Sequence, residues 1–311
     1  MRIGFYANYS EETALFAHDT GFSSLQLSAW QDSYLDANTI TSDKIDRMQK
    51  LLSDLDIEIS SLGYYPNYLD PNPAEGEHAQ AYFPKVVDLA AQLGVKVIST
   101  FAGRDPDKTV EENIPLFKEV FSRFCEYAEA KGVKIALENC PMIEKKTNKC
   151  HNIATGPEVW DVLFDVVPSD HLGIEFDPSH MVWQGMDYIA AIREYGHKIF
   201  HVHAKDMEID CVARKRMGIL GPSFGETSEL GQGWWRARTP GWGEVDWPKF
   251  ISAIIESGYR GNIDIEHEDS VFASLQPMST IATEGDIVAN YSLERVGLTL
   301  GYKTLAQYIV R

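Results

Sequence analysis

The sequence predicts an α/β protein that closes into one parallel (β/α)8 TIM barrel, with residues 1–311 forming a single domain. Short stretches rich in β-branched and apolar residues alternate with longer amphipathic stretches of helical spacing along the whole chain. Such alternation is typical of a parallel sheet. Because eight pairs of this kind follow one another, a closed eight-stranded barrel is favoured over an open doubly wound sheet.

The expected strands are short, and each is followed by a helix with a Gly or Asn near its end. The strands are expected at Arg2–Ala7, Ser24–Ala29, Glu58–Tyr64, Val95–Thr100, Val133–Glu138, Leu172–Asp177, Ile199–Lys205 and Gly261–Glu268. The helices are expected at Glu11–His18, Ser42–Leu55, Ala79–Leu93, Val110–Lys131, Pro157–Val166, Tyr188–Tyr195, Trp247–Ser257 and Leu293–Val310. No G-x-G-x-x-G pattern follows the first strand, which disfavours a dinucleotide-binding open sheet.

The longest connection, Met207–Val245, follows the seventh strand and is rich in glycine and tryptophan. Loops this long are uncommon in compact domains unless they are functional. We expect this loop to fold over the mouth of the barrel, where Trp234 can stack on a sugar ring and Arg238 can bind hydroxyl groups or an anion. The alternative is a loop that packs against the last helix or against a second subunit.

The composition favours a cytoplasmic protein that binds neither nucleic acid nor membranes. The formal net charge is −18 and Lys and Arg form no long run, which argues against a nucleic-acid partner. No apolar run approaches the roughly 18 residues of a membrane helix, and the first residues lack the apolar core of a secretory signal. The four cysteines show no C-x-x-C spacing and predict free thiols. The oligomeric state is left open, although barrels of this kind often form homo-oligomers.

Four consecutive strands each end with a polar side chain of a type that binds metal ions. These side chains are Glu138, Asp177, His203 and Glu266. Side chains alternate across a strand, so where Leu137 faces the helices, Glu138 faces the barrel interior, and the other three strands share this pattern. The active sites of such barrels lie at the C-terminal ends of the strands, where all four residues fall.

Bringing three carboxylates and an imidazole together without a cation is unfavourable, because like charges repel and burial penalises each carboxylate. A divalent cation removes this conflict. Oxygen and nitrogen ligands suit Mn²⁺, Mg²⁺, Co²⁺ or Zn²⁺, and a mainly carboxylate set favours the harder ions. We therefore expect one divalent metal ion at this position, with Mn²⁺ as the first choice.

Four motifs at these strand ends carry a resemblance that covers nearly the whole chain. They read ALENCPM at 136–142, EFDPSH at 175–180, HVHAKD at 201–206 and IEHED at 265–269. The sequence resembles the xylose isomerase-like superfamily of sugar isomerases and epimerases, which also includes inosose-processing enzymes and endonuclease IV. The resemblance is nearest to the ketose 3-epimerases and implies that Glu138, Asp177, His203 and Glu266 bind the metal.

The same resemblance implies substrate contacts for Glu144 and His180, which stand six residues after Glu138 and three after Asp177. It fails at position 209, where Ile209 stands in place of the arginine of that branch, so a ketohexose is not assigned as the substrate.

Lys205 is expected either to donate hydrogen bonds to substrate oxygens or to pair with Glu175 on the neighbouring strand. Two further histidines are not expected to bind the metal, and only His201 is given a supporting or structural role. His201 is expected to lie one layer below His203, and His267 to face the helix layer.

The implied chemistry is proton transfer on a carbohydrate through an enediolate, with Glu138 and Glu266 removing and returning the proton. Return of the proton to the opposite face of the same carbon gives an epimerase. Return of the proton to the neighbouring carbon gives an isomerase. Loss of a hydroxyl from the enediolate gives the alternative, a dehydratase or lyase acting on an inosose or 3-keto sugar. An endonuclease IV-type hydrolase needs a fuller histidine cluster and a basic face, and this sequence has neither. A non-catalytic sugar-binding barrel leaves an open metal site unexplained.

Overall fold

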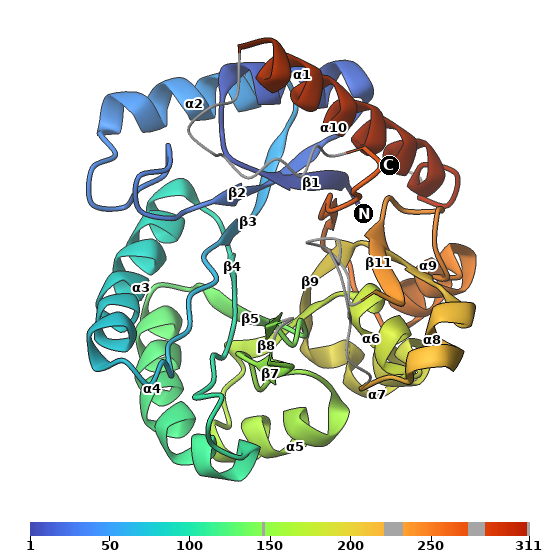
Figure 1. The fold of residues 1–311 in the computed structure, drawn as a ribbon. Helices are drawn as coiled ribbons and strands as arrows, with labels where there is room; N and C mark the ends of the chain where they lie inside the picture. Colours follow the sequence, from blue (N-terminus) through green and yellow to red (C-terminus); the bar gives the residue numbers. More distant parts are fainter. Residues whose placement is uncertain (145–146, 221–232, 273–283, 310–311) are drawn as a thin grey trace.

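A computed structural model describes residues 1–144, 147–220, 233–272 and 284–309. Within this part of the chain, eight parallel strands close into a barrel in the order β1-β12-β9-β8-β5-β4-β3-β2. The helices form a ring around it (Figure 1). The predicted parallel (β/α)8 barrel is therefore confirmed.

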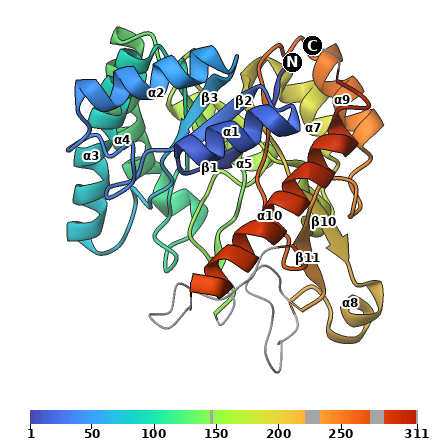
Figure 2. The ribbon, with the colours of Figure 1, turned by 90° about the horizontal axis from the view of Figure 1, so that it is seen from above.

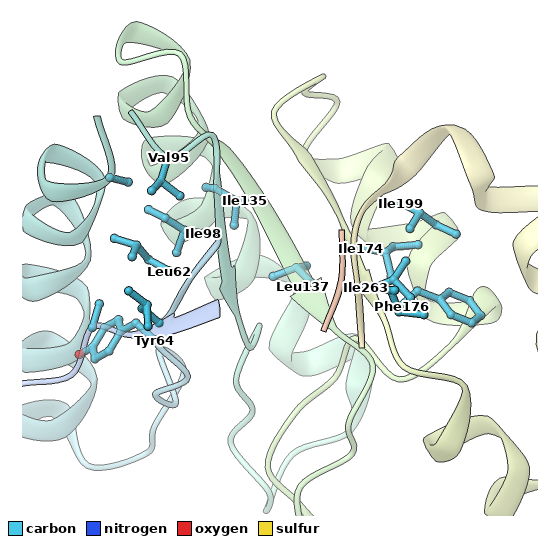
Figure 3. Packing of buried hydrophobic residues seen from close by; sticks show 14 of the residues in the cluster. Leu62, Tyr64, Val95, Ile98, Ile135, Leu137, Ile174, Phe176, Ile199 and Ile263 are labelled. Carbon is cyan, nitrogen blue, oxygen red and sulfur yellow. The ribbon is translucent and has the colours of Figure 1, made fainter. Parts of the chain in front are cut away.

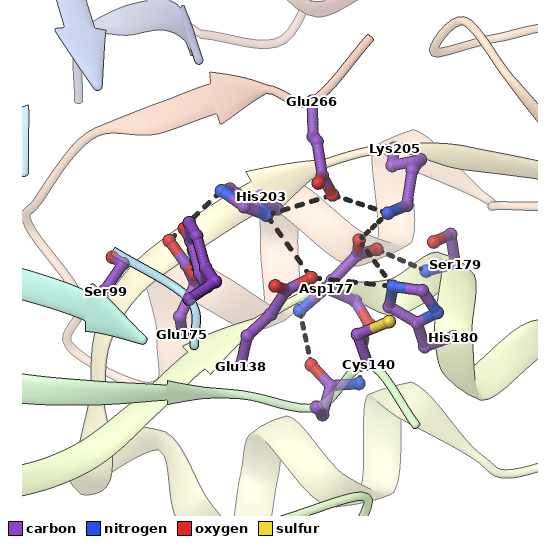
Figure 4. A network of polar contacts seen from close by, with 12 residues as sticks. Ser99, Glu138, Cys140, Glu175, Asp177, Ser179, His180, His203, Lys205 and Glu266 are labelled. Atoms are coloured by element: carbon purple, nitrogen blue, oxygen red, sulfur yellow. Dashed lines mark hydrogen bonds and ion pairs between the residues drawn. The ribbon is translucent and has the colours of Figure 1, made fainter. Parts of the chain in front are cut away.

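The strand positions agree closely with those expected from the sequence. The barrel strands are β1 Ile3–Ala7, β2 Ser24–Ser28, β3 Glu58–Gly63, β4 Val97–Thr100, β5 Lys134–Glu138, β8 Leu172–Phe176, β9 Ile199–Ala204 and β12 Ile263–Ile265. The last is much shorter than the expected Gly261–Glu268. Residues 266–269 follow the strand as loop, and Glu266 lies at the mouth of the barrel (Figure 4).

The main helices lie between the strands, and two short ones were not expected. The helices are α1 Glu11–Thr20, α2 Ser42–Asp54, α3 Pro73–Leu93, α4 Val110–Ala130, α5 Pro157–Val166, α7 Tyr188–Tyr195, α9 Trp247–Glu256 and α10 Glu284–Leu305, with the additional α6 Pro178–Gln184 and α8 Cys211–Met217. Helix α6 begins directly after β8 because Asp177 caps it, with its Oδ1 accepting the Ser179 N–H at 2.8 Å, and Pro178 fills the first helical position.

The core lies between the barrel strands and the surrounding helices. Alternate strand residues such as Leu62, Ile98, Ile135 and Ile174 point outward and are fully buried (Figure 3). Burying each aliphatic side chain of this size contributes about 1.5–3 kcal/mol. Because the outward face is used for packing, the inward face of the same strands is free to carry polar residues.

Two antiparallel hairpins lie beyond the C-terminal ends of the strands. One pairs β6 Ile143–Glu144 with β7 Lys149–Cys150, and the other pairs β10 Asp206–Ile209 with β11 Trp235–Arg238. The second hairpin and α8 extend from the end of the barrel opposite the N-terminus (Figure 2). The buried Asp206 holds this segment in place, since its carboxylate accepts 2.9 Å hydrogen bonds from Gly241 N, Val245 N and Trp247 Nε1.

All four cysteines are free, as expected. None of the helices in the described ranges is long and apolar enough to span a bilayer.

Candidate metal and substrate site

The four predicted metal ligands come together at the mouth of the barrel (Figure 4). Glu138 ends β5, Asp177 follows β8, His203 lies in β9 and Glu266 follows β12. His203 Nδ1 lies 3.7 Å from Glu138 Oε1 and 3.3 Å from Glu266 Oε2. Glu138, Asp177 and Glu266, together with His180, each offer a ligand atom within 4.8 Å of the others.

The hydrogen bonding of these side chains fits a divalent cation. Glu138 Oε1, Asp177 Oδ2 and His203 Nδ1 are buried and have no hydrogen-bond partner. Two of these atoms instead form ion pairs, Asp177 Oδ2 with Lys205 Nζ at 3.2 Å and His203 Nδ1 with Glu266 Oε2 at 3.3 Å. All three atoms belong to residues that converge on one place, and oxygen with imidazole nitrogen is a donor set that divalent metal ions accept.

Lys205 is fully buried beside these ligands and pairs with three carboxylates. Its Nζ lies 2.5 Å from Glu266 Oε2, 3.1 Å from Glu268 Oε2 and 3.2 Å from Asp177 Oδ2. Burial raises the pKa of Glu266, but the charges of Lys205 and His203 outweigh it and hold that pKa well below its usual range. Glu266 is therefore a carboxylate at neutral pH. The expected ion pair of Lys205 with Glu175 is wrong, because Glu175 is bound to histidines instead.

A second polar layer lies inside the barrel beneath the four ligands. Its centre is His201, whose Nδ1 lies 2.8 Å from Glu175 Oε1 and whose Nε2 lies 2.8 Å from Asp264 Oδ2. Asp264 also accepts hydrogen bonds from Ser24, at 2.8 Å, and from Ser60. Burial lowers the pKa of His201, yet hydrogen bonds to the two carboxylates raise it overall. The layer is an imidazolium held between two carboxylates, which agrees with the supporting role expected for His201.

This lower layer also fixes the orientation of His203. The Nε2 atom of His203 lies 2.6 Å from Gln26 Oε1 and 3.1 Å from Glu175 Oε1. Gln26 in turn donates hydrogen bonds to Glu175 at 2.7 Å and to Tyr65 at 2.8 Å. With Nε2 occupied, the ring presents Nδ1 to Glu138 and Glu266. A hydrogen bond on the far nitrogen of a metal-binding histidine commonly sets the ring in this way.

The expected substrate contacts lie at different distances from the four ligands. His180 is buried among them, with Nε2 3.5 Å from both Glu138 Oε1 and Asp177 Oδ2. Glu144 is exposed on the β6–β7 hairpin, where it accepts a 2.6 Å hydrogen bond from Thr147. The substrate role of Glu144 stays a prediction.

The expected contacts from the long loop are held by protein groups. Arg238 binds Asp269 Oδ2 at 2.9 Å and pairs with Glu208, which ties β11 to the segment after β12. Trp234 is 2% exposed, and its ring centroid lies 6.4 Å from that of Trp183 on α6. These contacts fit the alternative of a loop that packs on a helix, although the helix is α6 and not the last one. Sugar binding by Trp234 and Arg238 stays a prediction.

Residues 15–286 match the family described as xylose isomerase-like TIM barrel. The chain belongs to this family. Two curated relatives of this xylose isomerase-like barrel cover most of its length. It is 28% identical over 289 residues to the uncharacterized protein YfiH of Bacillus subtilis, covering 83% of this chain and 88% of YfiH. It is 26% identical over 237 residues to the inosose dehydratase of Clostridium tetani, covering 71% and 72% of the two chains.

Solved structures of related barrels superpose over nearly the whole chain. A D-psicose 3-epimerase crystallised in the presence of D-fructose matches with a TM-score of 0.66 at 15% identity, covering 98% and 99% of the two chains. The IOLI protein with a bound zinc atom matches with a TM-score of 0.68 at 18% identity over the full length of both chains. At these identities the similarity establishes a shared fold.

Several residues of this xylose isomerase-like site were not expected from the sequence. Gln26, Tyr65, Cys140 and Glu268 all lie within the two polar layers or contact them. A signal existed for Gln26, because a polar residue between Leu25 and Leu27 must face the barrel interior.

His267 lies where it was expected. It faces α10, since a Cβ added to Gly297 on that helix would overlap its imidazole.

Proposed function

We propose that the protein is a divalent-metal-dependent isomerase or epimerase that moves a proton on a ketose or related keto-sugar. The observation that carries this proposal is the convergence of three carboxylates and His203 at the mouth of the barrel, with ligand atoms left without hydrogen-bond partners. Membership of the xylose isomerase-like family supports it. The similarity of the fold to a ketose 3-epimerase is consistent with it.

Glu138, Asp177, His203 and Glu266 would hold the metal ion, and we infer Mn²⁺ as the working ion, with Mg²⁺, Co²⁺ or Zn²⁺ as alternatives. When bound, the ion supplies a Lewis acid that acidifies the proton next to a carbonyl group. Glu138 and Glu266 project from β5 and from the end of β12, so they approach a substrate from different directions. One removes the proton and the other returns it, which is the arrangement that epimerisation or isomerisation requires.

Lys205 and His180 assist these two glutamates. The ammonium of Lys205, 2.5 Å from Glu266, holds that carboxylate in position beside the other ligands. The imidazole of His180 lies beside Glu138 and Asp177, within reach of a substrate oxygen held between them. Both residues would also stabilise negative charge that develops on the sugar oxygen during proton removal.

We further propose that the substrate carries no phosphate or carboxylate. The two basic side chains described at the mouth are already paired, Lys205 with Asp177, Glu266 and Glu268, and Arg238 with Glu208 and Asp269. Neither is therefore free to bind an anionic group of a substrate bidentately, which suits a neutral polyol.

A second candidate is a dehydratase acting on an inosose or 3-keto sugar. It is favoured by Lys205 and Glu268, which lie 3.1 Å apart beside the four ligands and would provide a proton donor for a departing hydroxyl group. The inosose dehydratase of Clostridium tetani, at 26% identity, supports this alternative. The same initial proton removal by a glutamate serves both reactions.

One experiment separates these functions. The metal-loaded protein is incubated in D₂O with a panel of neutral ketoses and keto-inositols, and carbon-bound protons are followed by NMR. We expect exchange of a proton next to a carbonyl group, abolished by chelation and in Glu266→Gln. Exchange without loss of water identifies an isomerase or epimerase, and loss of water identifies a dehydratase. Absence of exchange with every compound, including phosphorylated and carboxylated ones, would contradict the proposal.

A further inference from the structure

We propose that Cys140, His180 and Glu138 form a second cation site, selective for a thiophilic divalent ion such as Zn²⁺, beside the four carboxylate and imidazole ligands. The three ligand atoms all lie within 4.8 Å of one another. The thiol of Cys140 and the imidazole of His180 face each other in Figure 4, next to the carboxylate of Glu138. This site shares Glu138 with the proposed catalytic metal site, but its binding of an ion does not depend on the proposed sugar chemistry.

The hydrogen bonding of His180 points to a ligand. The side chain is only 6% exposed, and neither of its ring nitrogens has a hydrogen-bond partner. Glu138 Oε1 has none either, and its contact with His180 Nε2 is a long ion pair of 3.5 Å, as is that of Asp177 Oδ2 with the same nitrogen. Buried polar atoms nearly always form hydrogen bonds in folded proteins. Side chains that meet only through such long contacts, beside the thiol of Cys140, are arranged as ligands would be.

The backbone around these side chains is held rigidly. Asn152 donates hydrogen bonds to the carbonyl oxygens of Glu138, at 2.9 Å, and of Cys140, at 2.8 Å. Asn139, between them, bonds both the N–H and the C=O of Asp177. These contacts fix the loop after β5 relative to the start of α6, which carries His180. The three ligands are therefore positioned before any ion arrives.

The donor set distinguishes this site from its neighbour. One sulfur, one imidazole nitrogen and one carboxylate oxygen, with a fourth position open, suit zinc in tetrahedral coordination. The neighbouring set is rich in oxygen and suits harder ions. Binding would release the thiol proton to solvent as the sulfur–metal bond forms. It would also engage His180, so a thiophilic ion would compete with any substrate that needs this histidine.

Cobalt provides the test, because a thiolate ligand gives Co²⁺ a strong near-ultraviolet charge-transfer band that oxygen and nitrogen ligands do not. Protein freed of metal is titrated with Co²⁺ while the spectrum and the bound metal are measured. We expect two ions per chain and a charge-transfer band. Cys140→Ser should lose the band and bind one ion, and His180→Gln should weaken the band while keeping the thiol. Cys150→Ser is the matched control, since this second partly buried thiol lies on the β6–β7 hairpin, and it should keep the band.

A band that survives in Cys140→Ser, or a wild-type protein that saturates with Co²⁺ without any band, overturns the second site. Loss of the band in Cys150→Ser alone would mean that Cys150 is the sulfur ligand, and it would equally overturn the proposed site. None of these readings depends on catalysis. The proposed function fails through the absence of proton exchange, and the second site fails through the spectrum, so the two failures are distinguishable.

Discussion

The two polar layers inside the barrel differ in how completely their atoms are partnered. In the lower layer, both nitrogens of His201 bind carboxylates at 2.8 Å, and Glu175 and Asp264 accept further bonds from amide and hydroxyl groups. In the upper layer, Glu138, Asp177 and His203 each keep a buried atom without a hydrogen-bond partner, although Asp177 and His203 form ion pairs with Lys205 and Glu266. The hydrogen bonds of the lower layer are satisfied by the protein, whereas those of the upper layer are not.

The charges of the two layers follow the same division. The lower layer places one imidazolium between two carboxylates and surrounds them with neutral donors. The upper layer gathers Asp177, Glu266 and Glu268 around the ammonium of Lys205, and Glu138 lies within 4.8 Å of Asp177 and Glu266. Removing a side chain from the lower layer should therefore affect folding, and removing one from the upper layer should affect ligand binding and catalysis.

The largest effect is expected for Glu138→Gln in the upper layer. The variant loses a metal ligand and a proton-transfer group, and general acid–base catalysis typically contributes about 10²–10⁴-fold in rate. Proton exchange followed by NMR should fall at least this far. The unfolding free energy of the metal-free protein should stay the same or rise, because a buried negative charge is removed. Glu126→Gln on the exposed face of α4 is the control. Unchanged proton exchange in Glu138→Gln would contradict the proposed role of Glu138.

In the lower layer, His201→Asn should mainly destabilise the fold. It leaves Glu175 and Asp264 buried without their shared cation, and breaking such a buried pair costs about 3–5 kcal/mol. The measurement is urea unfolding of the metal-free protein, with exposed His197→Asn as the control. The double variant His201→Asn, Asp264→Asn should recover part of the loss. A His201→Asn protein of normal stability that no longer binds metal would place His201 in the upper layer instead.

A third histidine, His267, sharpens the comparison through pH. Burial lowers its pKa to about 4 in the folded protein, against about 6.5 in the unfolded chain. Between these values the unfolded chain binds more protons, so the stabilisation is full above pH 6.5 and is lost as pH falls toward 4. By pH 5 we expect the wild type to lose about 2 kcal/mol more than His267→Gln in urea unfolding. Equal pH dependence of the two proteins would mean that this imidazole is solvated.

The sequence predicted the fold and the upper layer better than the lower layer. Strand parity placed Glu138, Asp177, His203 and Glu266 at one end of the barrel, because alternation is a local property of each strand. Hydrogen-bond partners depend on which strands face one another across the barrel, which is not a local property. Lys205 was therefore given the wrong partner in Glu175, and Gln26, which is remote from every motif, was missed. The position of Trp234 against α6 likewise depended on a helix that the sequence pattern did not reveal.

A smaller effect than those of Glu138 and His201 is expected for Gln26, the contact through which the two layers meet. Its Oε1 lies 2.6 Å from His203 Nε2, so Gln26→Leu removes the group that orients the ring, while Glu175 at 3.1 Å retains a weaker hold. Loss of such a partner typically lowers metal affinity about 10–100-fold. Titration with Mn²⁺ followed by electron paramagnetic resonance measures this, with Ser24→Ala, which contacts only Asp264 among these carboxylates, as the control. If Gln26→Leu binds Mn²⁺ as tightly as the wild type, Glu175 alone orients His203 and the lower layer reaches the metal site by that single contact.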